Sequence, residues 1–193
     1  MAEIDGATPK EQILEACRRD NVELFHEVLR GMEGQSVEQI AQFFNDMTDT
    51  LGNHLLHVCA NYGSSRYPLS IFWGPADLTA VDVMDELLNL EQLECDPLTP
   101  RDKETPIHRA VAYANEREID LGEAMAKILI EAGGDPRVKD KHGRKPADIC
   151  TPRTEQIRVM LRQEEYALNE GLKNGDVPQD DDDGPTGSAS DSD

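Results

Sequence analysis

The chain is poor in basic residues. Its 193 residues include 19 Lys and Arg against 39 Asp and Glu, which gives a formal net charge of −20. A surface of this charge repels nucleic acid and anionic membranes and attracts basic proteins. Residues 176–193 hold seven Asp and no basic residue, so the rest of the chain carries −13. We therefore expect a basic protein partner, and no direct contact with nucleic acid or membrane.

Long apolar segments are also missing. No run approaches the roughly 20 apolar residues that a membrane-spanning helix needs. The first ten residues, MAEIDGATPK, lack the apolar core of a secretion signal. We expect a cytoplasmic protein, monomeric when free, whose size also gives it passive access to the nucleus.

Cysteines are few and widely separated, and they form no C-x-x-C pair. They stand at Cys17, Cys59, Cys95 and Cys150. The interpretation we favour is buried free thiols in a reducing compartment. A structural disulfide or a zinc site is the alternative that the sequence leaves open.

Motifs of catalysis are missing as well. The chain has no glycine-rich phosphate loop, no Gly-x-Ser-x-Gly and no Cys with a plausible His partner. Adjacent acids such as Glu164 and Glu165 are typical of a solvated helix face. We predict that the protein is not an enzyme and has no catalytic residue, cofactor or metal ion.

What the chain does contain is a recurring string. Residues 49–57 read DTLGNHLLH, residues 105–111 read TPIHRAV and residues 140–148 read DKHGRKPAD. The order Asp-x-x-Gly-x-(Thr/His)-(Pro/Leu)-Leu-His resembles that of ankyrin repeats, which follow a β-turn with two antiparallel helices in about 33 residues. The chain looks like the small stand-alone ankyrin-repeat proteins of fungi.

The resemblance implies a role for each residue type in the string. Glycine permits a turn with positive φ, Thr caps the first helix and Pro sets its first φ. The His that ends the string, at His57 and His108, is in the family a hydrogen-bonding residue that ties successive turns together. We therefore expect no catalytic or metal-binding role for His54, His57 or His108.

The predicted fold is an all-α ankyrin-repeat solenoid of about four helix-turn-helix units with short turn tips. A flexible N-terminus (1–8) precedes the repeat domain (9–170), and a disordered acidic tail (171–193) follows it. The units are predicted at about 9–48, 49–99, 100–139 and 140–168.

Single residues refine this prediction. Thr8, Pro9 and Glu11 form a helix start, and residues 37–44 form a further short helix. Lys103 stands where the turn glycine is expected and Pro100 where the leading Asp is expected, so the third turn should be less regular. In the last helix we expect charged residues such as Arg158 to face water.

Two insertions are predicted to separate paired helices, at 64–80 and at about 115–121. The first carries Phe72 and Trp73, the only Trp of the chain. Three interpretations stay open for it: a satellite core packed on the helices, a segment without a selected role such as retained intron sequence, or an anchor for a partner.

The predicted partner-binding surface follows from the resemblance, since ankyrin arrays bind partners across the turn tips and the first-helix face. By position it comprises Leu51, Asn53, Asn61, Tyr62, Lys103, Arg109, Tyr113, His142 and Arg144. Packing between repeats is the alternative for each of these residues.

The acidic tail offers two more candidates. The run Asp180, Asp181, Asp182 and Asp183 could screen a basic client or simply keep the chain soluble. Ser188 and Ser190 each precede an Asp by three residues, a weak pattern for acidophilic kinases.

The predicted function is non-catalytic protein binding. The form we favour is an escort, or dedicated chaperone, for a basic client protein. The alternative is an adaptor or assembly factor that docks onto a subunit of a larger complex, such as the proteasome or a signalling complex.

Overall fold

In the computed structural model, the described residues are 6–62 and 82–174. They form eight α-helices and two short 3₁₀ helices, with no β-strand among them. The elements are α1 (Pro9–Arg19), α2 (Val22–Gly31), α3 (Val37–Asn45), α4 (Leu55–Tyr62), α5 (Asp82–Leu88), α6 (Pro106–Glu116), α7 (Ile119–Glu131), η2 (Pro146–Ile149), η3 (Pro152–Thr154) and α8 (Glu155–Asn174). The all-α prediction is confirmed.

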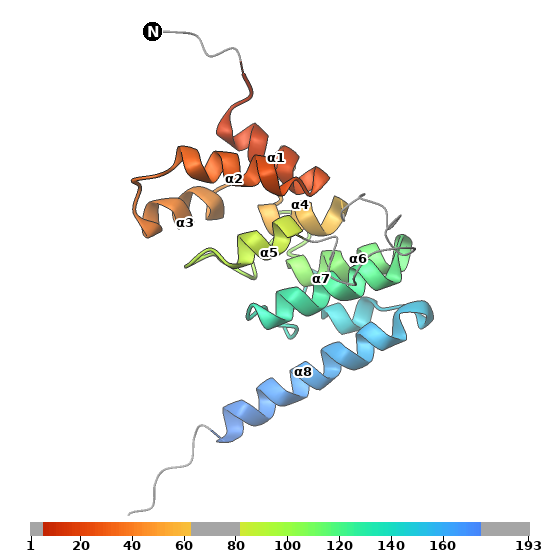
Figure 1. Ribbon diagram of the computed structural model, residues 1–193. Helices are drawn as coiled ribbons and strands as arrows, with labels where there is room; N and C mark the ends of the chain where they lie inside the picture. Colours follow the sequence, from red (N-terminus) through yellow and green to blue (C-terminus); the bar gives the residue numbers. More distant parts are fainter. Residues whose placement is uncertain (1–5, 63–81, 175–193) are drawn as a thin grey trace, which may run out of the picture.

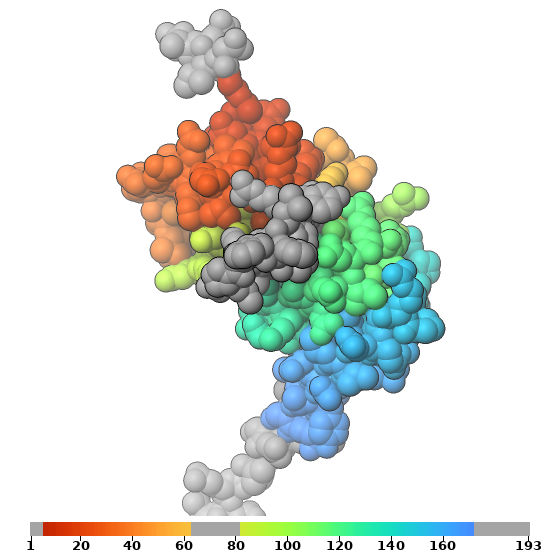
Figure 2. Space-filling model, turned by 45° about the vertical axis from the view of Figure 1, so that its right-hand side comes forward, coloured from red at the N-terminus to blue at the C-terminus, as the bar shows by residue number. Residues whose placement is uncertain are grey.

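The helices lie in two layers of a stacked array (Figure 1). The first helix of each unit packs on the first helix of the next, in the order α1, α4, α6 and η2. The second helices α2, α5 and α7 form the layer behind them, and α8 packs on η2. The colours of the space-filling view run in sequence order along the molecule, because each unit packs on its neighbours in the chain (Figure 2).

The N-terminal unit begins as the sequence predicts. The Thr8 hydroxyl accepts a hydrogen bond from Glu11 N at 3.3 Å, and the Glu11 carboxylate accepts one from Thr8 N at 2.8 Å. At the other end of α1, Asp20 adopts a left-handed conformation and ends the helix. Its buried carboxylate accepts from Val83 N at 2.8 Å, so Asp20 also joins this unit to the start of α5.

One apolar core runs through all the units. Fully buried side chains such as Phe25, Val58, Ile107, Leu129 and Ile157 come from successive helices and belong to a single cluster. A single repeat unit could not bury its apolar face alone. The continuous core supplies that burial and so allows each unit to fold.

The insertion predicted at about 115–121 does not form a separate segment between the paired helices. Helix α6 continues to Glu116 and α7 already begins at Ile119, so the extra residues lengthen both helices. The two helices approach closely at Gly122, where an added Cβ would lie 2.4 Å from the Cβ of Ala114 and 2.8 Å from its Cα. The lack of a side chain at Gly122 is therefore a packing requirement.

The last unit departs from the prediction at both ends. Its first helix shrinks to η2, while α8 continues to Asn174, past the predicted tail start at 171. Arg158 does not simply face water: its guanidinium donates to the carbonyl oxygens of Ala147 and Cys150. These bonds satisfy carbonyls that the short η2 leaves without helical partners.

The third turn keeps its form with one additional residue. Thr99 takes the place that Asp49 and Asp140 hold elsewhere, since its hydroxyl accepts from Glu104 N at 3.0 Å. Lys103 adopts the positive φ, 55°, that glycine adopts in the other turns. The sequence pattern placed Pro100 at the leading position of this turn. In the structure Thr99 occupies that position.

Several predictions of the sequence fall outside the described residues. They concern the insertion at 64–80 with Phe72 and Trp73, the acidic run Asp180–Asp183, and the serines Ser188 and Ser190.

The contact at Gly122 predicts that two glycine-to-alanine substitutions have opposite effects on the free energy of unfolding. Gly122→Ala should lower the free energy of unfolding by about 1–2 kcal/mol, because overpacking against Ala114 outweighs the better helix propensity of Ala. Gly171→Ala on α8, where no atom lies within 4 Å of the added Cβ, should raise it by about 0.5 kcal/mol. Urea unfolding measures both changes, and equal gains from the two variants would contradict the close packing of α6 on α7.

Candidate partner-binding groove

Carboxylates hold the turn tips in the same way in two units. Asp49 Oδ1 accepts from Leu51 N at 2.8 Å and from Asn53 N at 2.9 Å. Asp140 Oδ1 accepts from His142 N at 2.8 Å and from Arg144 N at 2.9 Å. Burial raises the pKa of both carboxyl groups, but the hydrogen bonds outweigh it and hold the pKa of Asp140 at about 2. Both groups therefore stay ionised and their turns stay closed.

Buried histidines connect each turn to the next. His57 Nε2 donates to the carbonyl oxygen of Glu104 at 2.8 Å, and His108 Nε2 donates to that of Arg144 at 3.1 Å. A carbonyl can only accept, so Nε2 carries the proton in both rings. This is the tying role that the resemblance implied for His57 and His108.

The other ring nitrogen differs between the two histidines. His108 Nδ1 accepts from the Thr105 hydroxyl at 2.9 Å. His57 Nδ1 is buried and has no partner among the described residues. The reason is that His54 stands where Thr105 stands in the next unit, and its own ring bonds the Asn45 carbonyl at 3.0 Å. Burial lowers the pKa of both rings, that of His57 to about 4.

The tied turns and first helices enclose a groove of about 270 Å³ between the second and third units. We call it the groove. It is lined by Asp49, Leu51, Asn53, Asn61, Tyr62, Arg109, Ala112, Tyr113, Glu116 and Arg117. Six of these residues belong to the predicted partner-binding set: Leu51, Asn53, Asn61, Tyr62, Arg109 and Tyr113.

Exposed apolar surface and stacked arginines mark the groove. The Leu51 side chain is 76% exposed at the turn tip and Tyr62 is 46% exposed at the end of α4. The Arg18 guanidinium lies over the Tyr62 ring at 5.8 Å, and that of Arg117 lies over the Tyr113 ring at 5.4 Å. Two tyrosine rings, each with a cation on its face, thus line the same groove.

Not every predicted residue offers a free contact. Asn53 is only 7% exposed and donates to Asp49 Oδ2 at 3.0 Å, so it braces the turn. Arg109 forms an ion pair with Glu104, with 2.8 Å between Arg109 Nε and Glu104 Oε2. Arg144 donates to Asp140 Oδ2 at 2.7 Å. The remaining predicted residues, Lys103 and His142, lie on the neighbouring tips and, like Arg144, do not line the groove.

The sequence prediction missed Asp49, Ala112, Glu116 and Arg117 as lining residues. Arg117 follows Tyr113 by four residues, a spacing that brings side chains together only on a continuous helix. The insertion predicted at 115–121 concealed that spacing. Because α6 continues to Glu116, Tyr113 and Arg117 lie on the same side of one helix end.

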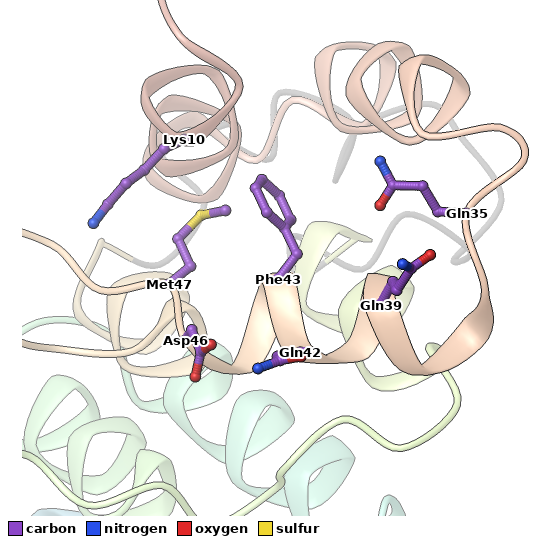
Figure 3. Close-up of a pocket in the computed structure, with 7 residues that line it drawn as sticks. All are labelled: Lys10, Gln35, Gln39, Gln42, Phe43, Asp46 and Met47. Carbon is purple, nitrogen blue, oxygen red and sulfur yellow. The ribbon is translucent and has the colours of Figure 1, made fainter.

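A second, wider hollow of about 690 Å³ lies in the first unit, between α1 and α3 (Figure 3). Phe43 and Met47 point from α3 and the chain after it into this hollow, and Lys10 lies on the α1 side. The remaining lining groups are Gln35, Gln39, Gln42 and Asp46. This hollow contains none of the predicted binding residues and belongs to a single unit.

Other kinds of site find no counterpart in residues 6–62 and 82–174. Those residues contain no cluster of three or more His, Cys, Asp or Glu side chains that could hold a metal ion. None of their helices is long and apolar enough to cross a membrane. All four cysteines are free; Cys17 and Cys59 meet between α1 and α4, where their hydrogen bond and burial raise the pKa of Cys59. These are the free thiols that the sequence indicated.

A stacked array of paired helices with histidine-tied turns defines a repeat protein, and the comparisons identify which kind. The chain is 33% identical over 187 residues to the ankyrin repeat-containing protein YGL242C of Saccharomyces cerevisiae, covering 94% of this chain and 93% of that one. It is also 28% identical over 86 residues to zinc finger CCCH domain-containing protein 56 of Arabidopsis thaliana, covering 44% of this chain and 12% of the plant protein. No protein-family model matches the chain.

The chain belongs to the ankyrin-repeat proteins. Its resemblance to the small ankyrin-repeat proteins of fungi is confirmed by a relative that it matches almost from end to end. Ankyrin repeats are protein–protein interaction modules and are typically without enzymatic activity.

The buried histidines predict how stability depends on pH. Between pH 6.5 and about 4 the unfolded chain binds a proton on His57 that the folded chain does not, so the free energy of unfolding falls as the pH falls. The loss that His57 contributes is about 3 kcal/mol over this window, and His108 adds to it in the same direction. Urea unfolding at several pH values should give a flatter profile for His57→Gln, which keeps a donor toward Glu104. The exposed His142→Gln should keep the wild-type slope, and equal slopes in all three proteins would contradict the assignment.

The unpaired Nδ1 of His57 predicts a stabilising substitution. His54→Thr should supply the hydroxyl that Thr105 supplies to His108, and it should cap α4 at the same time. His54→Ala loses the bond to Asn45 equally but supplies no hydroxyl. We expect the Thr variant to exceed the Ala variant by about 1 kcal/mol in thermal or urea unfolding. No difference between them would mean that His57 Nδ1 gains nothing from a partner.

Proposed function

We propose that this protein is a non-catalytic adaptor that holds one partner protein in the groove. The observation that carries the proposal is the convergence of six residues, chosen by their repeat positions, on one groove with exposed apolar surface. Isolated exposed apolar residues are common, but a cluster of them beside aromatic rings in a concave site is typical of interface centres.

The size of the groove fits the centre of an interface and not its whole extent. A standard interface engages roughly 20–30 residues on each partner, whereas ten residues line the groove. The neighbouring tips with Lys103 and His142 extend the surface on the side of the later units. We therefore propose a contact that is anchored at Leu51 and Tyr62 and continues over these tips.

The escort of a basic client is the second candidate, and the charge of the second helices favours it. Helices α2, α5 and α7 carry the acids Glu23, Glu27, Asp82, Asp85, Glu86, Asp120, Glu123 and Glu131, against the basic residues Arg30 and Lys127. An acidic outer layer of this kind attracts basic proteins. We propose the cytoplasm, with access to the nucleus, as the place of either function.

Co-purification with the tagged full-length chain from its own cells tests the adaptor. The double variant Leu51→Ser/Tyr62→Ser should reduce the amount of captured partner at least about tenfold, because apolar anchors dominate interface energies. The matched control is Val159→Ser/Tyr166→Ser on α8, which removes a pair that is 48% and 67% exposed elsewhere on the array. This control should capture the partner as well as the unmodified chain does.

A third variant separates the two candidates. Glu23→Gln/Glu27→Gln/Asp85→Asn neutralises exposed acids of the second layer. If this variant no longer captures a basic protein that the groove variant still captures, the escort function would be supported in place of the adaptor function. Equal capture by all variants would refute a role for either surface.

A further inference from the structure

We infer that the partner presents an acidic segment with an apolar or aromatic side chain to the groove. This inference rests on the proposed adaptor function and names the chemistry of its partner. It departs from the basic partner that the net charge of −20 indicates, and the reason lies in how the charges of the groove are engaged.

The two Arg–Tyr stacks leave hydrogen-bond donors available. Arg117 forms no ion pair with another described residue. Arg18 lies 3.9 Å from Glu15, and its charge also contributes to lowering the pKa of Asp49. A guanidinium over the face of a ring is attracted by the ring without using its N–H groups, and these form the fork that binds a carboxylate with two hydrogen bonds. Arg117 thus offers a carboxylate site in the lining of the groove, and Arg18 offers a second one beside it, over the Tyr62 ring.

The acids near the groove are mostly engaged already. Asp49 accepts three hydrogen bonds from its own turn, from Leu51 N, Asn53 N and Asn53 Nδ2. Glu104 is the ion-pair partner of Arg109. Of the acids that line the groove or pair with its cations, only Glu116 has no partner among the described residues. A basic segment would find one free carboxylate there and would meet Arg18 and Arg117 at close range.

The acidic outer layer does not cancel this local preference. At physiological ionic strength the Debye length is about 8 Å, so charges on the far side of the array are largely screened at the groove. The arginines at the groove act within contact distance. They decide which charge is favoured in the bound state, since like charges placed opposite each other weaken a complex.

The apolar part of the partner follows from the exposed surface between the arginines. The exposed side chains of Leu51 and Tyr62 offer apolar contact. An aromatic or aliphatic side chain placed there would be flanked by carboxylates on the stacked arginines. The hollow between α1 and α3 does not have this pattern, because its lining contains three glutamines and no arginine.

Selection from a random-peptide phage library on the full-length protein tests the inference at physiological salt. We expect enriched peptides to carry several Asp or Glu residues around a Phe, Tyr, Trp or Leu. Synthetic copies should bind Arg18→Gln/Arg117→Gln at least about tenfold more weakly than the unmodified chain. The matched control Arg153→Gln/Arg162→Gln removes two exposed arginines of the last unit and should leave binding unchanged.

The other outcomes each have a distinct meaning. Basic peptides that lose binding to Leu51→Ser/Tyr62→Ser would overturn the acidic partner and leave the adaptor function standing. Peptides that bind all variants equally, together with undiminished partner capture by the groove variant, would overturn both. Acidic peptides without an apolar residue, displaced by a synthetic peptide of residues 175–193, would assign the groove to the chain's own acidic end in place of a partner.

Discussion

The structure depends on the hydrogen bond that each buried histidine donates to the next turn. His57 reaches Glu104 and His108 reaches Arg144, in both cases a backbone carbonyl at the base of a tip. Because the imidazoles are buried and neutral, the bond fixes the spacing of successive tips and first helices without introducing a charge. The groove is a consequence of that spacing, since its two walls belong to units that the His57 bond joins.

The same constraint determines which side chains at the tips can meet a partner. A closed turn uses its leading carboxylate internally, as Asp49 and Asp140 show. Arg144 and Asn53 are then held by those carboxylates, although their positions on the surface suggested free contacts. Leu51 points away from this network and Arg117 lies beyond it. The position of a residue in its repeat therefore predicts where its side chain lies on the surface. The hydrogen-bond network decides whether that side chain is available to a partner.

The repeated string was sufficient for the fold class because its residues act locally, in a turn and a helix start. The errors arose where a tertiary contact replaced the expected local signal. Lys103 adopts a positive φ because the surrounding turn holds it there, and Arg158 faces inward because η2 is short. The supposed insertion at 115–121 is helical because α6 and α7 pack at Gly122. These contacts have no pattern in a single sequence, so the length of α6 was not predictable. The spacing of Tyr113 and Arg117 therefore could not be recognised as a contact on one helix.

Net charge describes the whole chain and not one surface, and the array explains why the two can differ. In a two-layer repeat, each residue's position in its unit decides which surface it joins, so acids can collect on one layer while the other stays mixed. The second helices of this chain carry eight acids against two basic residues, whereas the tips pair their acids with arginine and lysine. A composition of −20 then describes the outer layer and the sequence end, and says little about a groove where two arginines over tyrosine rings face one acid, Glu116, without a partner among the described residues. The charge of a partner has to be inferred from the unpaired groups at the site of contact, and at this groove they favour a carboxylate.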